Sequence, residues 1–453
     1  MSGCVAVFDV GKTNLKLVVF DRAGSVVADR SHPNASLSPD AACPYLRLDT
    51  ERAFSFLLSA LKEIGARHPI EAISISAHGA SGVLVTEDGA ALAPMDYEFD
   101  GFGAVDAAYD AIRPPFEECF SPRSKGGLNL GRQIFYLERK FAEKFAGARA
   151  FLTYPQFWSW RLSGIMATEV TSLGAHTDLW RPKEGRLSSL VEKRGWRRLF
   201  PPIRRAWETL GRLRPEIAAE TRLKPETRVV CGAHDSNASL VPYLATRSDP
   251  FTVLSTGTWV IILAVGGTAP IVEKADMLAN VDVRGHPVPT ARLMLGREFA
   301  ALAGDAPAEA NEGDVAALVA AGVMAMPAFT DQGGPFAGRK GFIQGAAPKA
   351  PAGRSALATL YCALTAAHML KLLEAPGDLI VEGGFNRSPA FAGVLAALMP
   401  GRNVLIAPAS GAAEGAAMLA HWDEPHASPK LAHAQAWAIP GLTEYRERWE
   451  RGL

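Results

Sequence analysis

The residues from Val5 to Asp21, VAVFDVGKTNLKLVVFD, decide the fold of the first part of the chain. Two short apolar runs flank the polar segment Gly11-Lys12-Thr13-Asn14, and the first run ends on the carboxylate of Asp9. Two such runs joined by a glycine-containing connection predict a β-hairpin. The turn can point consecutive backbone N–H groups at an anion, and its side chains and Lys16 add donors and charge. The pattern therefore predicts a cradle for the phosphates of a nucleotide.

The position of Asp9 adds a metal to this prediction. Mg²⁺ prefers one or two carboxylates together with phosphate oxygens, and Asp9 stands at the strand end where the phosphates are expected. The segment is not a P-loop, because the first glycine that the motif G-x-x-x-x-G-K-[ST] requires falls at Ala6. An edge hairpin with a polar turn is the simpler alternative, since short glycine loops are common.

A second copy of the pattern favours the phosphate interpretation. Residues Phe251 to Val265, FTVLSTGTWVIILAV, again place a small polar loop between two apolar runs, with the loop residues Ser255, Thr256, Gly257 and Thr258. Internal similarity at so long a spacing indicates two related domains rather than a solenoid. The polar connection at 246–250 precedes the second copy, so we expect domains at 1–246 and 247–453.

Composition restricts the class of protein. A chain of 453 residues is long enough for two or three domains, and its 48% hydrophobic content can fill large cores. Lys+Arg and Asp+Glu are equal at 47 each, which gives no support for a nucleic-acid or membrane partner. The five cysteines are scattered without a C-x-x-C pair, and neither a signal peptide nor a long apolar run is apparent. These features predict a cytoplasmic protein without structural zinc.

One segment, 186–214, is locally basic and contains Trp196, Phe200 and Trp207. Basic residues mixed with aromatic ones can mark a nucleic-acid site. Helices with one charged face give the same composition, and the neutral charge of the chain favours that interpretation.

Strand ends in the N-terminal part supply further candidate residues. Residues 49–67 have apolar side chains at helical spacing, and Ile70 to Ala77 is a predicted strand that runs into His78-Gly79. Ligands of α/β sheets gather at such ends, although a structural histidine is the more common case. The loop Asp96-Tyr97-Glu98-Phe99-Asp100 combines acids, which accept hydrogen bonds from hydroxyls, with aromatic faces that cover C–H surfaces. A solvated acidic turn is its alternative.

Asp235 stands where a strand from Arg228 to Cys231 passes through Gly232-Ala233-His234 into a short helix. A carboxylate here is a candidate general base, and a helix-capping aspartate is the structural alternative. Later in the chain, a strand from Leu379 to Glu382 runs into Gly383-Gly384-Phe385-Asn386, where bare backbone can take a planar group. Residues 355–373 predict a buried Ala-rich helix, and the last 30 residues a tail along the surface.

Taken in this order, the segments resemble the FGGY carbohydrate kinases, within the superfamily of actin, hexokinase and the heat-shock chaperone ATPases. The resemblance covers nearly the whole chain and is closest to the L-fuculose and L-rhamnulose kinases. It rests on five motifs in register: Asp9–Lys16, Gly232–Asp235, Ser255–Thr258, Gly383-Gly384 and Gly411–Ala420. It implies an α/β protein of two ribonuclease-H-like domains flanking a deep cleft, with the sugar held mainly by 1–246 and ATP mainly by 247–453.

The resemblance also implies roles for individual residues. Asp235 is the expected base for a sugar hydroxyl, and Asp9 and Asp235 are the expected Mg²⁺ residues. The residues expected to bind ATP are Gly11, Lys12, Thr13, Asn14, Lys16, Ser255, Thr256, Gly257, Thr258, Gly383, Gly384 and Asn386. Those expected to contact the sugar are His78, Gly79, Asp96, Tyr97, Glu98, Gln156, His234, Asp235 and Trp259.

Two departures concern the sugar. Many members have a Trp-x-Asp-x-Arg motif where this chain has residues 96–100, so the arginine is missing, and Lys12 replaces a usually small residue. The expected reaction is ATP-dependent phosphorylation of a ketose, at C1, by a monomer or homodimer whose partners are small molecules. A sugar sensor without catalysis and a non-sugar ATPase of the same superfamily are the alternatives.

Overall fold

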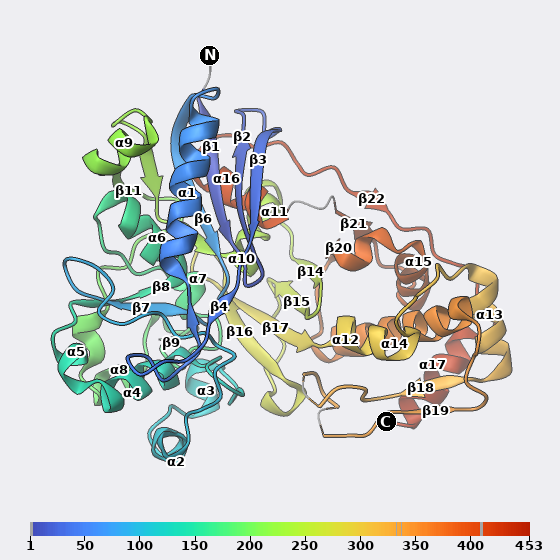
Figure 1. Ribbon diagram of the computed structural model, residues 1–453. Coiled ribbons are helices and arrows are strands. Elements are labelled where there is room, and N and C mark those ends of the chain that lie inside the picture. The colour runs from blue at the N-terminus through green and yellow to red at the C-terminus, as the bar shows by residue number, and fades with distance from the viewer. Residues whose placement is uncertain (1–2, 332, 337, 408–410) are drawn as a thin grey trace. The chain divides into compact units, whose positions relative to one another are not determined.

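The computed structural model describes residues 3–331, 333–336, 338–407 and 411–453, without the side chains of Ala104, Asn386 and Arg387. The chain forms two compact units (Figure 1). Unit 1 comprises Met1–Thr246, Ala279–Pro287 and Ser410–Ser428, and unit 2 comprises Arg247–Leu278, Val288–Ala409 and Pro429–Leu453. The chain therefore returns to unit 1 twice after residue 246. The assignment of sugar and ATP to separate domains stays a prediction.

Seven strands form the main sheet of unit 1: β1 (Cys4–Val10), β2 (Asn14–Phe20), β3 (Val26–Pro33), β6 (Ile70–Ala77), β11 (Thr209–Arg212), β12 (Arg228–Val230) and β13 (Ala233–His234). The strand order is β11-β12-β6-β1-β2-β3, with β13 beside β6. The predicted hairpin of β1 and β2 is antiparallel, whereas β1 and β12 run parallel to β6. The sheet is therefore mixed, as expected for an α/β fold.

The two faces of this sheet are covered by different helices. Along β1, Ala6, Phe8 and Val10 enter the core that contains the apolar face of α1 (Thr50–Gly65), the helix predicted at 49–67. Because side chains alternate along a strand, Asp9 points to the opposite face. That face is covered by α16 (Gly411–Leu419), which packs against β1 and β6 (Figure 1). The carboxylate of Asp9 is thereby directed away from the larger core.

The remaining elements of unit 1 form a second layer with its own core, which includes the buried Trp180, Trp196 and Phe200. Its small sheets pair β4 (Ser36–Leu37) with β5 (Arg47–Leu48), β7 (Gly82–Val85) with β8 (Ala150–Thr153), and β9 (Trp180–Arg181) with β10 (Arg186–Leu187). Its helices are α2 (Ala104–Asp110), α3 (Phe116–Cys119), α4 (Leu130–Lys140), α5 (Ala142–Ala146), α7 (Val170–Leu173), α8 (Ser189–Lys193) and η1 (Trp196–Leu199). The helices α6 (Tyr154–Ser163) and α9 (Pro215–Thr221) belong instead to the core shared by α1 and the main sheet, and α10 (Asp235–Ala238) and α11 (Val241–Thr246) pack against α16.

Burial of two aromatic residues of the basic segment 186–214 argues against a nucleic-acid site there. Trp196 is 1% exposed and Phe200 is 5% exposed, so neither can stack on a base. Arg198 donates to the backbone carbonyls of Phe145 and Ala148 at 3.0 and 2.7 Å.

The sheet of unit 2 repeats the arrangement of unit 1. Its strands are β14 (Phe251–Thr256), β15 (Val260–Val265), β16 (Met277–Val281), β17 (Pro287–Leu293), β20 (Asp378–Gly383), β21 (Val404–Ile406) and β22 (Ala432–His433). The antiparallel hairpin β14–β15 lies next to the parallel strand β20, as β1–β2 lies next to β6. The order β17-β15-β14-β20-β21 thus matches β3-β2-β1-β6-β12, which is the ribonuclease-H-like order. The internal similarity seen in the sequence is confirmed.

Helices of unit 2 pack around a single long one. They are η2 (Glu273–Ala275), α12 (Leu295–Ala303), α13 (Glu312–Ala321), α14 (Pro351–Leu372), η3 (Gly384–Arg387), α15 (Pro389–Leu398) and α17 (Leu442–Arg451), and a small sheet pairs β18 (Met324–Met326) with β19 (Phe342–Gln344). By length and composition α14 alone among the described helices could cross a membrane, but 83% of its most apolar window is buried inside the protein. The prediction of a buried helix at 355–373 is confirmed.

The C-terminal segment differs from the predicted surface tail. It ends in the amphipathic helix α17, whose Tyr445 and Trp449 are each 1% exposed. Their polar atoms donate to the carbonyls of Val323 and Ala325 at 2.6 and 2.9 Å. The spacing of Leu442, Tyr445 and Trp449 is helical, and this signal was hidden by the many charged residues between them.

Candidate active site

Asp9 lies next to the last residue of β1, between Ser76 of β6 and Lys16 of β2. Burial and the negative charge of Asp235, opposed by the positive charge of Lys16, together raise the pKa of Asp9 to about 6. The two neighbouring carboxylates repel each other when both are ionised. A bound cation would relieve this repulsion, so the position favours cation binding.

Asp235 follows β13 directly and begins α10. Its Oδ1 accepts hydrogen bonds from the backbone N–H and the hydroxyl of Ser236 at 2.6 and 3.3 Å, and lies 3.2 Å from Nε2 of His234. Oδ2 accepts no hydrogen bond from the residues that the structure describes. The side chain is 33% exposed. One oxygen is therefore held while the other stays available, which suits a general base.

His234 orients this carboxylate. Nδ2 of Asn237 lies 3.0 Å from Nδ1 of His234, and an amide nitrogen can only donate. Burial lowers the pKa of His234, so the ring is neutral and its single proton is on Nε2, facing Asp235. The ring occupies the space beside Gly79, where a Cβ would lie 2.6 Å from Nε2. The glycine after His78 is therefore required by the packing of His234.

His78 presents an unused acceptor to the same region. Its Nδ1 donates to the carbonyl of Gly79 at 3.0 Å, which leaves Nε2 as an acceptor. Burial lowers the pKa of His78, and Nε2 has no hydrogen-bond partner among the described residues. The rings of Tyr97 and Tyr154 lie 5.6 and 4.9 Å from the imidazole, measured between ring centres. A hydroxyl donor would satisfy the buried nitrogen.

The turn between β1 and β2 is closed by its own backbone and by Asn34, and its role as a phosphate cradle stays a prediction. The N–H of Gly11 donates to the carbonyl of Asn14 at 2.9 Å, and Asn34 supports the turn through bonds to Gly11 and Thr13 at 2.8 Å each. Thr13, Asn14 and Lys16 are exposed. Asn34 was not identified from the sequence, because its role depends on the pairing of β3 with β2.

Lys12 points elsewhere. Its ammonium forms an ion pair with Asp96, donates to Ser36 Oγ at 3.2 Å and lies 3.4 Å from Glu98. Asp96 is fully buried, and it also accepts from the hydroxyl of Ser36 and from the N–H of Glu98. Its carboxylate is thus occupied inside the protein, so a direct bond from Asp96 to a sugar stays a prediction. Glu98, with a side chain 59% exposed, faces solvent, as does Asp100 of the same loop.

Gln156 also uses its polar atoms internally. The side chain is fully buried, and its amide nitrogen donates to the carbonyls of Cys231 and Gly232 at 3.1 and 3.0 Å. The hydroxyl of Thr153 donates to its oxygen at 2.5 Å. Through these hydrogen bonds Gln156 holds the backbone of the segment before Asp235. The predicted contact of Gln156 with a sugar would require these bonds to break.

A second support for this segment was missed in the sequence. The hydroxyl of Thr171 accepts from the N–H of His234 at 3.0 Å and donates to the buried Glu169 at 2.5 Å. Burial raises the pKa of Glu169 to about 7. The only sequence signal was an acid among hydroxyl residues, Thr168-Glu169-Val170-Thr171-Ser172, which is weak by itself.

In unit 2, the loop between β14 and β15 is joined to the glycine pair at the end of β20. The hydroxyl of Thr256 donates to the carbonyl of Glu382 at 2.5 Å and accepts from the N–H of Phe385 at 2.8 Å. Gly383 has φ +85°, and a Cβ there would overlap the carbonyl oxygen of Thr256. The two predicted ATP segments are therefore one local structure, although the buried hydroxyl of Thr256 is already used.

The other residues of unit 2 that were predicted to bind ATP or sugar differ in solvent exposure. Gly257, Thr258 and Gly384 are exposed, and Ser255 is half-buried. The Trp259 ring packs against Arg292, whose guanidinium lies 5.9 Å from the ring centre. Its role as a wall of the sugar site stays a prediction. The side chain of Asn386 lies outside the described residues.

The residues present fit a magnesium ion held mainly by nucleotide phosphates. The charge of Asp235 raises the pKa of Asp9, so the two carboxylates are near each other, and Mg²⁺ needs only one or two carboxylates when phosphates complete its octahedron. Within the described residues there is no group of three or more His, Cys, Asp or Glu side chains that could enclose a metal.

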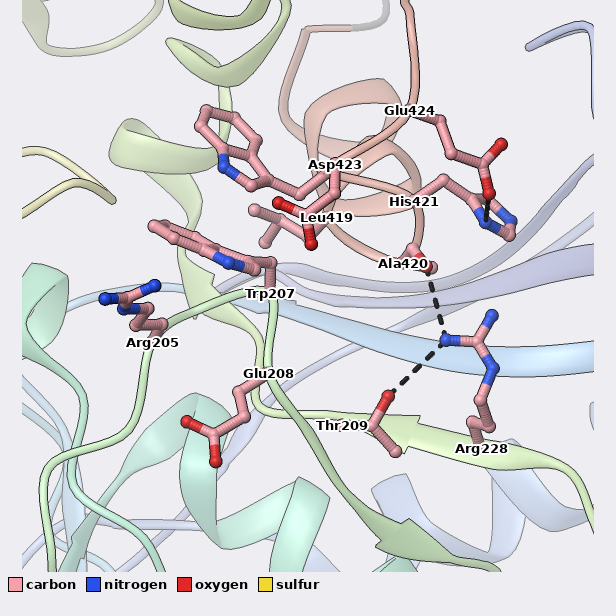
Figure 2. A pocket seen from close by; sticks show the side chains of 11 residues that line it. Arg205, Trp207, Glu208, Thr209, Arg228, Leu419, Ala420, His421, Asp423 and Glu424 are labelled. Carbon is pink, nitrogen blue, oxygen red and sulfur yellow. Dashed lines mark hydrogen bonds and ion pairs between the residues drawn. The ribbon is translucent and has the colours of Figure 1, made fainter.

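A separate cavity of about 490 Å³ contains none of the predicted residues. Figure 2 shows it between β11, the start of β12 and the segment after α16, with Arg228 bonded to Thr209 and to the carbonyl of Ala420. Arg228 lies beside Ala72, and His234 beside Ala77, along the same strand β6. Five residues of strand correspond to about 16 Å, so Arg228 and this cavity lie toward the opposite end of β6 from His234 and Asp235.

Comparison with known proteins identifies the family. The family described as "Carbohydrate kinase FGGY, C-terminal domain" matches residues 248–429. The crystal structure of a carbohydrate kinase from Novosphingobium aromaticivorans is 34% identical, with a TM-score of 0.91, over 100% of this chain and 98% of that one. The chain belongs to the FGGY family of carbohydrate kinases. The resemblance found in the sequence motifs is confirmed, and so is the fold class of ribonuclease-H-like units.

Two further sugar kinases are more distantly similar. The xylulose kinase from Rhodospirillum rubrum is 21% identical, with a TM-score of 0.78, over 99% of this chain and 97% of that one. The L-fuculokinase of Escherichia coli K12 is 25% identical over 265 residues, which are 57% of this chain and 56% of that protein. The match thus spans little more than half of this curated FGGY relative.

Proposed function

We propose that this protein is an ATP-dependent kinase that phosphorylates a sugar hydroxyl. The observation that carries the proposal is the Asp235 carboxylate, held through Oδ1 with Oδ2 available, next to the unused acceptor of His78. The acceptor is expected to be a ketose phosphorylated at C1, such as a 6-deoxyketohexose or a ketopentose. The similarity of this chain to L-fuculokinase favours a 6-deoxyketohexose. Its similarity to the xylulose kinase is one of fold, and a ketopentose is the second candidate.

In the reaction, Oδ2 of Asp235 accepts the proton of the attacking hydroxyl. The sugar oxygen forms a bond to the γ-phosphorus, the bond from that phosphorus to the β,γ-bridging oxygen breaks, and ADP leaves. Positioning and charge stabilisation provide most of the catalysis of phosphoryl transfer, and a placed base contributes about 10²–10⁴-fold. Nε2 of His234, 3.2 Å from Oδ1, would limit rotation of the carboxylate.

The acceptor would lie against unit 1 residues. Nε2 of His78 accepts from one sugar hydroxyl and Glu98 from another, while the ring of Tyr97 covers C–H surface. Asp96, Glu98 and Asp235 outnumber the single ammonium of Lys12 here. This charge balance favours a neutral polyhydroxylated acceptor over a sugar acid, because a carboxylate would be repelled.

The nucleotide would be held by the two β-hairpin turns. Backbone N–H groups and the exposed Thr13, Asn14 and Thr258 donate to phosphate oxygens, and Lys16 offsets their charge. Gly383 and Gly384 leave bare backbone for the adenosine. Asp9 and Asp235 would hold Mg²⁺, which neutralises charge on the β- and γ-phosphates when bound.

We propose the cytoplasm as the setting of the reaction. All five cysteines carry free thiols, which agrees with the reducing conditions of the cytoplasm. We expect an enzyme that acts on small molecules as a monomer or homodimer.

A coupled ADP-release assay tests this function. Mg-ATP and a panel of ketopentoses, ketohexoses, 6-deoxyketoses, polyols and one aldonic acid are compared for the wild type, Asp235→Asn and the exposed control Asp88→Asn. We expect turnover with a neutral ketose that only Asp235→Asn abolishes. ATP hydrolysis indifferent to every sugar would support a non-sugar ATPase instead, and sugar binding without turnover would support a sensor.

A further inference from the structure

Lys12 occupies an unexpected position for a residue of the β1–β2 turn. Its backbone belongs to the predicted phosphate cradle, but its side chain, 20% exposed, leads away to the loop at 95–100. The ammonium meets the buried carboxylate of Asp96 and stands 5.0 Å from the centre of the Tyr97 ring. The cation is therefore placed over a predicted wall of the sugar site.

Asp96 fixes Lys12 there. Its Oδ2 is bonded to Lys12 and Ser36, its Oδ1 accepts from the N–H of Glu98 at 2.9 Å, and its own N–H donates to the carbonyl of Leu46 at 2.8 Å. A buried carboxylate requires such partners, since an uncompensated charge is costly. Hydrogen bonding to Lys12 and Ser36 keeps the pKa of Asp96 below its ordinary value despite burial. The pair is thus ionised and rigidly held.

Two further contacts link Lys12 to the acceptor residues. Glu98 lies 3.4 Å from the ammonium, so its exposed carboxylate is drawn toward Tyr97. The positive charge of Lys12 also contributes to the lowered pKa of His78, which keeps that imidazole neutral and able to accept. Lys12 therefore acts on the three residues, His78, Tyr97 and Glu98, that would contact a sugar.

We propose that Lys12 is a positioning residue of the acceptor site and not a ligand of the nucleotide phosphates. Fixed by Asp96 and Ser36, its ammonium holds Glu98 and the Tyr97 loop in place for a neutral polyhydroxylated acceptor. It connects this loop to the turn that is expected to hold the phosphates. The inference rests on the proposed sugar kinase function, and it gives the two departures from the family pattern, Lys12 and the altered loop 96–100, one common purpose.

The test separates acceptor from nucleotide effects. Lys12→Met is compared with wild type and with Lys144→Met, an exposed lysine. We expect the acceptor KM to rise about 10-fold or more, as for the loss of a hydrogen bond to a charged group. The KM for ATP, measured at saturating acceptor, should stay within about twofold. Lys12→Arg keeps the charge and should restore the acceptor KM to within about threefold. A rise confined to the ATP KM would overturn the proposal.

Two additions keep the test decisive. Lys12→Met/Asp96→Asn avoids an unpaired buried carboxylate, so it reports on the acceptor KM even if Lys12→Met folds poorly. Calorimetric titration with Mg-ADP needs no turnover, and Lys12→Met should bind it as wild type does. A 10-fold weaker binding of Mg-ADP would assign Lys12 to the phosphates. Absence of turnover with every acceptor would reject the proposed kinase function, while the titration would still decide the place of Lys12.

Discussion

The two sheets repeat one strand order, but equivalent positions carry different chemistry. Asp9, the penultimate residue of β1, faces Lys16 across its hairpin, whereas Ser255, the penultimate residue of β14, faces Ile261. The first hairpin thus has a carboxylate and an ammonium where the second has a hydroxyl and an alkyl group. Both loops can donate backbone N–H groups to an anion.

The strands beside these hairpins differ in the same way. β6 runs into the buried imidazole of His78, while β20 ends in the bare backbone of Gly383 and Gly384. The two units thus repeat one fold, while the carboxylates and histidines proposed for proton transfer and metal binding lie in unit 1. We therefore expect substitutions at equivalent positions to have unequal effects.

The largest difference should appear in activity after Asp9→Asn. Loss of a metal-holding carboxylate should lower kcat/KM by on the order of 10²-fold or more, because metal-assisted charge stabilisation contributes several kcal/mol. The ADP-release assay at saturating Mg²⁺ measures this. Activity within a few fold of wild type would show that the charged position of unit 1 is no more important than its neutral counterpart.

The same substitution should stabilise the protein without ligands. Raising the pKa of Asp9 from 3.8 to about 6 corresponds to about 3 kcal/mol that opposes folding once the group is ionised. The carboxyl is neutral below its ordinary pKa, so Asp9→Asn and wild type should be similar near pH 3.8. As the pH rises through about 6 the wild type loses stability, and at pH 8 the variant should be the more stable by up to about 3 kcal/mol.

Urea unfolding of both proteins at several pH values tests this, in metal-free buffer. If the difference in free energy of unfolding between Asp9→Asn and wild type does not grow between pH 4 and pH 8, the ionised Asp9 is not the source of the instability. Asp88→Asn, at an exposed carboxylate, serves as the control and should show no such trend.

In unit 2 the sensitive position is a glycine. Gly383→Ala should lower the free energy of unfolding by about 1–3 kcal/mol, because the residue has positive φ and its Cβ would collide with Thr256. Gly24→Ala is the matched control, since Gly24 has φ +81° but open space around its Cβ. Denaturant unfolding of both variants separates the collision from the cost of positive φ. If the free energy of unfolding fell equally in Gly383→Ala and Gly24→Ala, the contact with Thr256 would contribute nothing to the loss of stability.

The smallest effect should come from Ser255→Ala, at the counterpart of Asp9. Loss of one neutral hydrogen bond corresponds to about 1 kcal/mol, so we expect the KM for ATP to rise about fivefold with kcat unchanged. Steady-state kinetics with varied ATP checks this. If Ser255→Ala lowered kcat/KM as much as Asp9→Asn does, the two hairpins would not differ in importance for catalysis.

The elements that the sequence predicted well depend on local patterns. The hairpins have apolar runs beside small polar turns, α1 has its capping Asp49 and apolar spacing, and the strand of residues 70–77 ends at the expected residue. Each of these signals is contained in a segment of about 20 residues or fewer, and periodicity and capping decide the conformation of such a segment. They were sufficient to recognise the duplicated fold.

The side-chain partners in the site depend on distant residues and were missed. Lys12 meets Asp96 across 84 residues, and Gln156 reaches Cys231 across 75. Each of these residues looked suitable for a ligand, but its polar atoms are used within the protein. Periodicity gives no information about such pairs, because they form only when segments of unit 1 that are distant in the sequence pack together.

The return of α16 to unit 1 has a consequence for synthesis of the chain. Gly415 packs so closely on the carbonyl of Ala238 that no side chain fits, and α16 covers the face of β1 that carries Asp9. This face must stay uncovered until residue 419 has emerged from the ribosome. An N-terminal fragment ending at residue 246 would expose it permanently, so the first unit to be translated is completed only by one of the last helices.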